Sequence, residues 1–177
     1  VFTERIEQLR FDYADEVDGL FDEELWYLDE TGFNLHVAQL RRWAKKGHTP
    51  VEAVAPSKGQ NMSLLMCICS DGIAHFVLKD GAFRAPEFVA FVQELVEQFP
   101  KLQTGAACLV MDNARIHHPR EAGKFLEENH VRHIYLPPYS PDLNPIENVF
   151  AALKRRYRGL GGSCDKSTNG GPDQNGC

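Results

Sequence analysis

The sequence lacks any hydrophobic run long enough to cross a membrane. No apolar stretch reaches the roughly 18 residues that a membrane-spanning helix needs. A charged-then-apolar leader of the secretory kind is also missing. We therefore expect a protein that neither spans a membrane nor is secreted. Because the sequence starts with Val1 rather than Met, we further expect a fragment or a processed product.

Cysteine is scarce and does not fall into a recognisable spacing. The chain has five cysteines, an odd number, without the intervals of a disulfide framework or a zinc site. Cys67 and Cys69 alternate along an apolar run, so they should lie on one face of a strand. This pattern indicates buried free thiols in a reducing, intracellular compartment.

The chain also lacks an overall positive charge, which argues against nucleic-acid binding. Its formal net charge is −6, but the first 30 residues alone carry −9, so the remainder carries +3. Two basic clusters lie in that remainder. They comprise Arg41, Arg42, Lys45 and Lys46, and then Lys154, Arg155, Arg156 and Arg158. Each cluster is either a phosphate-binding surface or a solvated charged face.

The sequence does contain an alternation of strand and helix patterns. Short apolar runs predict strands at residues 25–29, 61–70, 73–79, 107–111 and 131–136, with a hairpin turn at Asp71-Gly72. Apolar residues at helical spacing, with prolines near the helix starts, predict helices at 86–99, 119–129 and 145–158. The order of these elements predicts an α/β fold in which helices flank a mixed sheet.

The two ends of the chain differ from this central pattern. Residues 1–21 are strongly acidic and predict a leader helix or a linker. Residues 159–177 are rich in Gly, Ser, Asn and Asp, and they predict a disordered tail. A single domain is therefore expected over residues 22–158.

Three acidic residues are the candidate functional site. Asp29 and Asp112 each follow an apolar run, and Glu147 lies at the start of the last helix. Carboxylates at the ends of sheet strands lie where the ligand sites of α/β proteins gather. Two aspartates and a glutamate offer only oxygen atoms, which Mg²⁺ and Mn²⁺ prefer. Two such ions about 4 Å apart support in-line attack on a phosphodiester.

Each of these acids also has a purely structural interpretation. Asp29 and Asp112 could end strands as turn residues, and Glu30 competes with Asp29 as a ligand. For Glu147, Asn144 would be the helix N-cap and Glu147 the third helical residue of a capping box. The stiff, proline-rich segment before it favours a ligand role, because a metal site needs preorganised side chains.

Other polar residues near the motifs give weaker signals. His117 and His118 could contact DNA or assist proton transfer, or they could be ordinary turn histidines. Tyr139 and Ser140 could touch a phosphate or could close their loop on itself. Trp43, beside basic residues, could stack on a base, although a half-buried core position is the commoner role for tryptophan.

Long motifs surround all three acids. The first is DETGF at Asp29, the second is MDNARIHH at Asp112, and the third is LPPYSPDLNPIENVF at Glu147. The segment RRWAKKGHTP lies between the first two, and 34 residues separate Asp112 from Glu147. In these features residues 22–158 resemble the catalytic domain of Tc1/mariner-type transposases, which include the bacterial insertion-sequence 630 group.

The resemblance implies a ribonuclease-H-like fold and a DDE site in which Asp29, Asp112 and Glu147 bind two Mg²⁺ or Mn²⁺ ions. It implies DNA cleavage at transposon ends, followed by strand transfer into target DNA without a covalent protein–DNA intermediate. DNA is the implied partner and a homodimer is a candidate assembly. DNA contacts are expected at Arg41, Arg42, Lys45, Lys46, His117, Lys154 and Arg155. The protein is expected in the nucleus of a eukaryote, or in the cytoplasm and nucleoid of a bacterium.

Two departures from the family pattern leave alternatives open. No helix-turn-helix region precedes the first motif, and a low-complexity tail follows the last helix. We therefore expect a truncated enzyme that does not transpose autonomously. One alternative is a non-catalytic or domesticated remnant that serves as a nucleic-acid interaction module. Another is a ribonuclease-H-like nuclease of a different kind.

Overall fold

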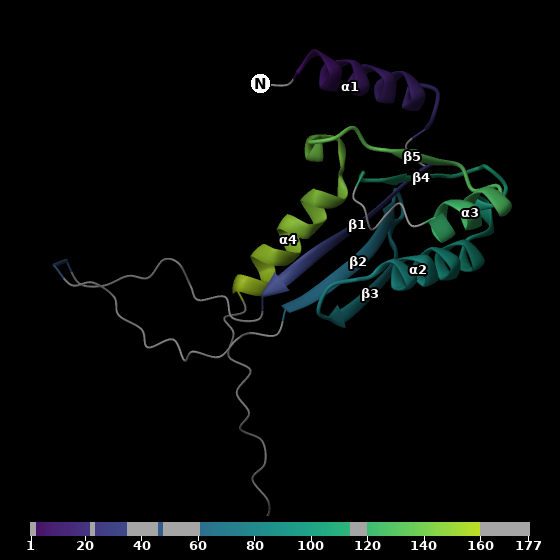
Figure 1. Cartoon of the computed structure of the whole chain (residues 1–177). Helices are drawn as coiled ribbons and strands as arrows, with labels where there is room; N and C mark the ends of the chain where they lie inside the picture. The colour runs from purple at the N-terminus through teal and green to yellow at the C-terminus, as the bar shows by residue number, and fades with distance from the viewer. Residues whose placement is uncertain (1–2, 22–23, 35–45, 48–60, 114–119, 160–177) are drawn as a thin grey trace, which may run out of the picture.

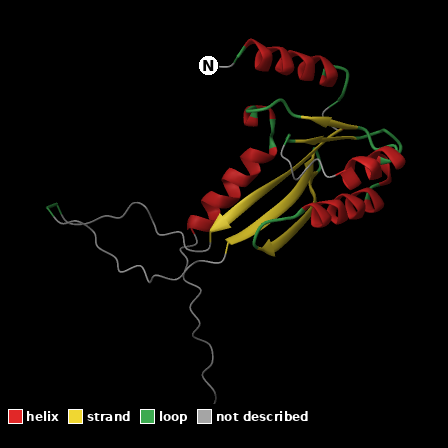
Figure 2. Ribbon diagram, viewed as in Figure 1, coloured by secondary structure: helices red, strands yellow, loops and turns green. Residues whose placement is uncertain are grey.

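The molecule is built around one mixed β-sheet with helices on both faces (Figures 1 and 2). The computed structural model describes residues 3–21, 24–34, 46–47, 61–113 and 120–159. The strands are β1 (Leu25–Asn34), β2 (Asn61–Cys69), β3 (Gly72–Asp80), β4 (Cys108–Met111) and β5 (His133–Tyr135). The helices are α1 (Glu4–Val17), α2 (Ala85–Gln98), α3 (Arg120–Glu128) and α4 (Ile146–Gly159), with short 3₁₀ turns η2 (Pro100–Leu102) and η4 (Pro141–Leu143).

The strand order in the sheet is β3-β2-β1-β4-β5. β1, β2 and β3 form an antiparallel meander, and β4 and β5 extend it in parallel with β1. The predicted hairpin turn between β2 and β3 is confirmed, and Gly72 has a φ of +118° that suits glycine. The sheet is therefore the mixed one that the order of elements predicts.

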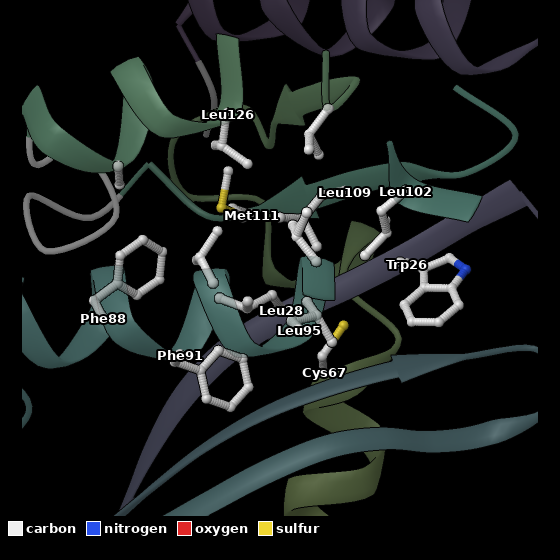
Figure 3. Close-up of a cluster of buried hydrophobic side chains, with 14 of the residues drawn as sticks. Trp26, Leu28, Cys67, Phe88, Phe91, Leu95, Leu102, Leu109, Met111 and Leu126 are labelled. Carbon is white, nitrogen blue, oxygen red and sulfur yellow. The ribbon is translucent and has the colours of Figure 1, made fainter. Parts of the chain in front are cut away.

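The face of the sheet under α2 and α3 carries the largest hydrophobic cluster. Figure 3 shows Leu28, Leu109 and Met111 of the sheet meeting Phe88 and Leu95 of α2. The predicted helical spacing of α2 is confirmed, because its buried residues are Phe88, Phe91, Val92, Leu95 and Val96. Burying each such side chain stabilises the fold by about 1.5–3 kcal/mol before entropic costs. This face therefore anchors β1 and β4 side by side.

Helices α1 and α4 cover the opposite face. Tyr13 of α1 lies in a cluster with Leu25, Val110 and residues of β5. α1 also reaches the loop before α4, because Arg10 donates two hydrogen bonds to Asp142, at 3.1 and 2.6 Å. The acidic leader is therefore a helix of the domain in residues 4–17, rather than a linker.

α4 is held against the antiparallel part of the sheet. Ile146 and Phe150 are fully buried in a cluster with Leu64 and Met66 of β2. Their spacing of four residues places both on one face of the helix. This contact fixes the first turn of α4, where Glu147 lies.

One strand prediction was wrong in its length. The apolar run predicts that the first strand ends at Asp29, but β1 continues to Asn34. The reason is that β2 pairs with β1 from Tyr27 to Asn34, whereas β4 pairs only with Leu25–Leu28. The parallel pairing on one side of β1 therefore stops one residue before Asp29, while Asp29 still belongs to the antiparallel pairing on the other side.

Within the described residues, the prediction of buried free thiols is confirmed for Cys67, whereas Cys69 is only half-buried. Cys67, Cys69 and Cys108 are free, and Cys67 and Cys108 are buried. Burial raises the pKa of the Cys67 thiol far above its usual value, and it raises the pKa of the Cys108 thiol to about 11. These thiols therefore stay protonated near neutral pH. No helix in the described ranges is both long and apolar enough to cross a bilayer.

Candidate active site

The parallel pairing of β1 with β4 brings Asp29 and Asp112 together. Leu28 is opposite Met111 in the register, so Asp29 follows this pair on β1 and Asp112 is the first residue after β4. Side chains alternate between faces along a strand. Leu25 and Val110 pack on the face that α1 covers, and Asp29 and Asp112 follow them by an even number of residues. Both aspartates therefore belong to the sheet face that also receives α4.

All three predicted acids line one cavity of about 470 Å³. Glu147 reaches it from the first turn of α4, while Asp29 and Asp112 reach it from the sheet. The remaining walls are Asn113, Asn144 and the loop that joins β5 to η4, namely Leu136, Pro137, Pro138, Tyr139, Ser140 and Pro141. Residues from three separate parts of the sequence thus meet at one edge of the sheet.

Asp29 is held in place through both carboxylate oxygens. Its side chain is buried, with 7% of the residue exposed. Oδ1 accepts a hydrogen bond from the Glu30 backbone N–H at 2.7 Å, and Oδ2 accepts one from Asn144 Nδ2 at 2.9 Å. Hydrogen bonds to an ionised acceptor are the stronger kind. The two donors therefore fix the direction in which this carboxylate faces.

The sequence predicts that Asn144 caps α4, but its side chain does not do so. It ends η4, and its side-chain amide donates to Asp29 rather than accepting from the start of α4. Its Oδ1 is buried and has no hydrogen-bond partner among the described residues. The capping-box interpretation of Asn144 and Glu147 is therefore wrong, because the side-chain oxygen of Asn144 accepts no bond from the start of α4. Sequence reasoning missed this contact, which joins residues 115 positions apart.

The donor atoms around the cavity suit a hard divalent cation. Three carboxylates provide an all-oxygen set. Asp112 is half-buried and Glu147 is exposed. Within the described ranges, no three Asp, Glu, His or Cys side chains converge closely enough to hold a metal ion. The acids share the cavity, but they do not form a closed ligand cluster.

The predicted DNA contacts are only partly described. Arg41, Arg42, Lys45 and His117 lie outside the described residues, as do His118 and Trp43. Lys46 and Arg155 are exposed, and Lys154 Nζ lies 5.9 Å from the centre of the Phe33 ring. Lys154 follows Glu147 by seven residues, which is about 10 Å along a helix axis. The basic end of α4 therefore begins about two helical turns from Glu147. The DNA contacts of these basic residues stay predictions.

Comparison with known proteins decides the family. A family model described as "DDE superfamily endonuclease" matches residues 24–167, which include all three acids. The chain belongs to this family. The match runs past the end of α4 into the predicted tail, so the domain boundaries at residues 22 and 158 stay predictions. No curated protein matches the sequence of this chain.

Solved structures give the fold of this chain. The catalytic domain of Mos1 mariner transposase matches with a TM-score of 0.65 and 18% identity, over 89% of this chain and 74% of that one. A pre-cleavage Mos1 transpososome matches with a TM-score of 0.74 and 18% identity, over 89% and 51%. A Mos1 paired-end complex with Mn matches with a TM-score of 0.72 and 19% identity, over 89% and 50%. The chain thus spans about half the length of the transposases in these complexes.

These matches confirm two predictions made from the sequence. The ribonuclease-H-like mixed sheet flanked by helices is confirmed as the fold. The resemblance to a Tc1/mariner-type DDE catalytic domain is also confirmed at the level of family and fold. The individual site residues stay predictions, supported by the cavity that they share.

Proposed function

We propose that this chain is the catalytic domain of a DDE transposase, which cleaves a DNA phosphodiester and transfers the freed strand to target DNA. The observation that carries the proposal is the cavity in which Asp29, Asp112 and Glu147 meet. Asp29 and Asp112 continue paired strands, and Glu147 is placed opposite them by the buried contact of α4 with β2. A scaffold that unites three distant acids favours catalysis over the alternative of a non-catalytic remnant.

We assign Asp29, Asp112 and Glu147 as the residues that would hold two Mg²⁺ or Mn²⁺ ions. Mos1 catalytic domains have been solved with Mn and with Mg, and the donor atoms here suit both metals. When bound, such a pair activates the attacking oxygen and neutralises charge on the leaving oxygen. The side chains themselves orient the site: Asn144 and the Glu30 amide hold Asp29, and Ile146 and Phe150 hold the turn that bears Glu147.

The partners follow from this proposal. The substrate is duplex DNA, at a transposon end and at a target, and a homodimer would hold two ends together. Mos1 transposase has been solved as a paired-end complex with a transposon end, which supports this arrangement. The domain would then act where DNA is found, in the nucleus of a eukaryote or in the cytoplasm and nucleoid of a bacterium.

The test is Mn²⁺-dependent nicking of supercoiled plasmid by the chain as it stands. We expect nicking by the parent protein, and a fall to background in Asp112→Asn and Glu147→Gln, because each variant removes one charged ligand. Glu97→Gln is the matched control, since Glu97 is an exposed glutamate on α2, which covers the other face of the sheet. It should nick like the parent.

Two other results would count against the proposal. Nicking that survives in both site variants would place the activity elsewhere. Cleavage of an RNA–DNA hybrid in preference to duplex DNA would instead support the third interpretation, a different ribonuclease-H-like nuclease.

A further inference from the structure

Tyr139 is the most exposed large aromatic residue in the described part of the chain. It is 82% exposed, yet it lines the cavity that holds the three acids. Its φ is +58°, in the left-handed region that residues with a side chain rarely adopt. An exposed ring therefore stands at the mouth of the site on a strained backbone.

The surrounding loop explains how the ring is held outward. Leu136 is tied to the sheet by its N–H, which donates to the Met111 carbonyl at 2.8 Å. Ser140 is buried, and its hydroxyl donates back to the Pro138 carbonyl at 3.3 Å. Ser140 faces inward, and the prolines at 137, 138 and 141 limit the conformations of the backbone. Tyr139, which lies between Pro138 and Ser140, therefore faces solvent. The loop thus fixes the ring without burying it.

The other non-glycine residue with a positive φ among the described residues has an ordinary explanation. His130 has a φ of +55° and lies two residues beyond the end of α3. The Val131 N–H donates to the Leu126 carbonyl at 2.8 Å, as at a helix end that closes through a left-handed residue. Tyr139 ends no such helix and gains no burial from its position. Backbone strain that brings neither burial nor a helix cap is found most often at functional sites.

We propose that Tyr139 is a stacking platform for a DNA base next to the phosphate that enters the cavity. The proposal rests on the proposed function and names a substrate contact of the same site. A base at a DNA end or beside a strand break has lost its stacking neighbour on one side, so one of its faces is open. An exposed aromatic ring can stack on such a base, and this stacking is possible with any of the four bases. Among the described residues, no other ring or cation covers Tyr139.

The test uses two substitutions to glycine at the two left-handed positions. Tyr139→Gly and His130→Gly both relieve backbone strain, so both should leave Tm unchanged or raise it. Only Tyr139→Gly removes a ring at the cavity. Tyr139→Phe keeps the ring and loses only the hydroxyl, so it should behave like the parent.

The probe is a short DNA duplex with a single-stranded extension that contains 2-aminopurine, whose fluorescence falls when it stacks. We expect Tyr139→Gly to bind this DNA about tenfold more weakly than the parent and to lose the quenching. His130→Gly and Tyr139→Phe should match the parent in both measurements.

Three outcomes would overturn the inference, and they differ in meaning. Parental affinity and quenching in Tyr139→Gly would show that the ring meets no base. A lower Tm together with weaker binding would make Tyr139 a structural support of the loop. If the parent itself neither binds this DNA nor nicks plasmid, the proposed function fails together with the inference.

Discussion

At the scale of single residues, the orientation of Asp29 depends on Asn144. The side chains are buried together, and the 2.9 Å hydrogen bond between them links the sheet to the turn before Glu147. Asn144 leaves its own Oδ1 without a partner in the described structure. A buried polar atom of this kind costs free energy. We infer that the fold tolerates this cost because Asn144 positions Asp29.

We predict that Asn144→Ala lowers the free energy of unfolding by about 1–3 kcal/mol, since it leaves a buried carboxylate oxygen without its donor. The measurement is urea denaturation in a chelator, so that metal plays no part. Asn148→Ala, at an exposed position one turn further along, should change stability by less than about 0.5 kcal/mol. Equal effects of the two substitutions would mean that the Asp29 contact contributes little.

At the scale of elements, α1 braces the loop that leads into α4. The Arg10–Asp142 pair joins the helix to η4, and Leu143 packs beside Tyr13 and Val17. The hydrogen bond from Arg10 holds the pKa of Asp142 below its usual value. A carboxyl group with a lowered pKa in the folded state stabilises the fold above its unfolded pKa. That contribution disappears as the pH falls through the folded value.

We predict that Asp142→Asn loosens α1 at pH 7 and has little effect at pH values below the lowered pKa of Asp142. Hydrogen exchange of the α1 amides, followed against pH, measures this directly. Asp15→Asn serves as the control, because Asp15 is an exposed acid on the same helix. A difference from the parent that persists unchanged at low pH would mean that the ion pair is not what holds α1.

At the scale of the whole molecule, the proposed metal site connects elements that are far apart in sequence. Three carboxylates around one cavity repel one another when no cation is present. A cation that binds only the folded chain therefore stabilises the entire domain. The effect of the cation should therefore appear in the free energy of unfolding of the whole domain.

We predict that Mn²⁺ at about a hundred times its dissociation constant raises the free energy of unfolding by about 2.7 kcal/mol, and Tm by about 5–10 °C. Asp112→Asn should lose most of this shift, and Glu97→Gln should keep it. Thermal unfolding with and without Mn²⁺ is the measurement. A full shift in Asp112→Asn would place the metal elsewhere.

Much of this architecture could be predicted because its signals are local. Helical spacing in α2 and the apolar run of β4 were sufficient to predict both elements. The length of β1 was missed because it depends on pairing with β2, not on its own apolar residues. The contact between Asn144 and Asp29 was missed for the same reason, as was the outward turn of Tyr139. Each depends on partners that only the folded chain brings together.

The register of β1 against β4 has a consequence for the time at which the site arises. Leu28 and Met111, which set this register, are 83 positions apart in the chain. Glu147 belongs to α4, the last helix of the described domain. During synthesis the three acids can therefore come together only after nearly the whole described domain has left the ribosome. The proposed nuclease activity therefore cannot begin before the part of the chain that includes α4 has been made.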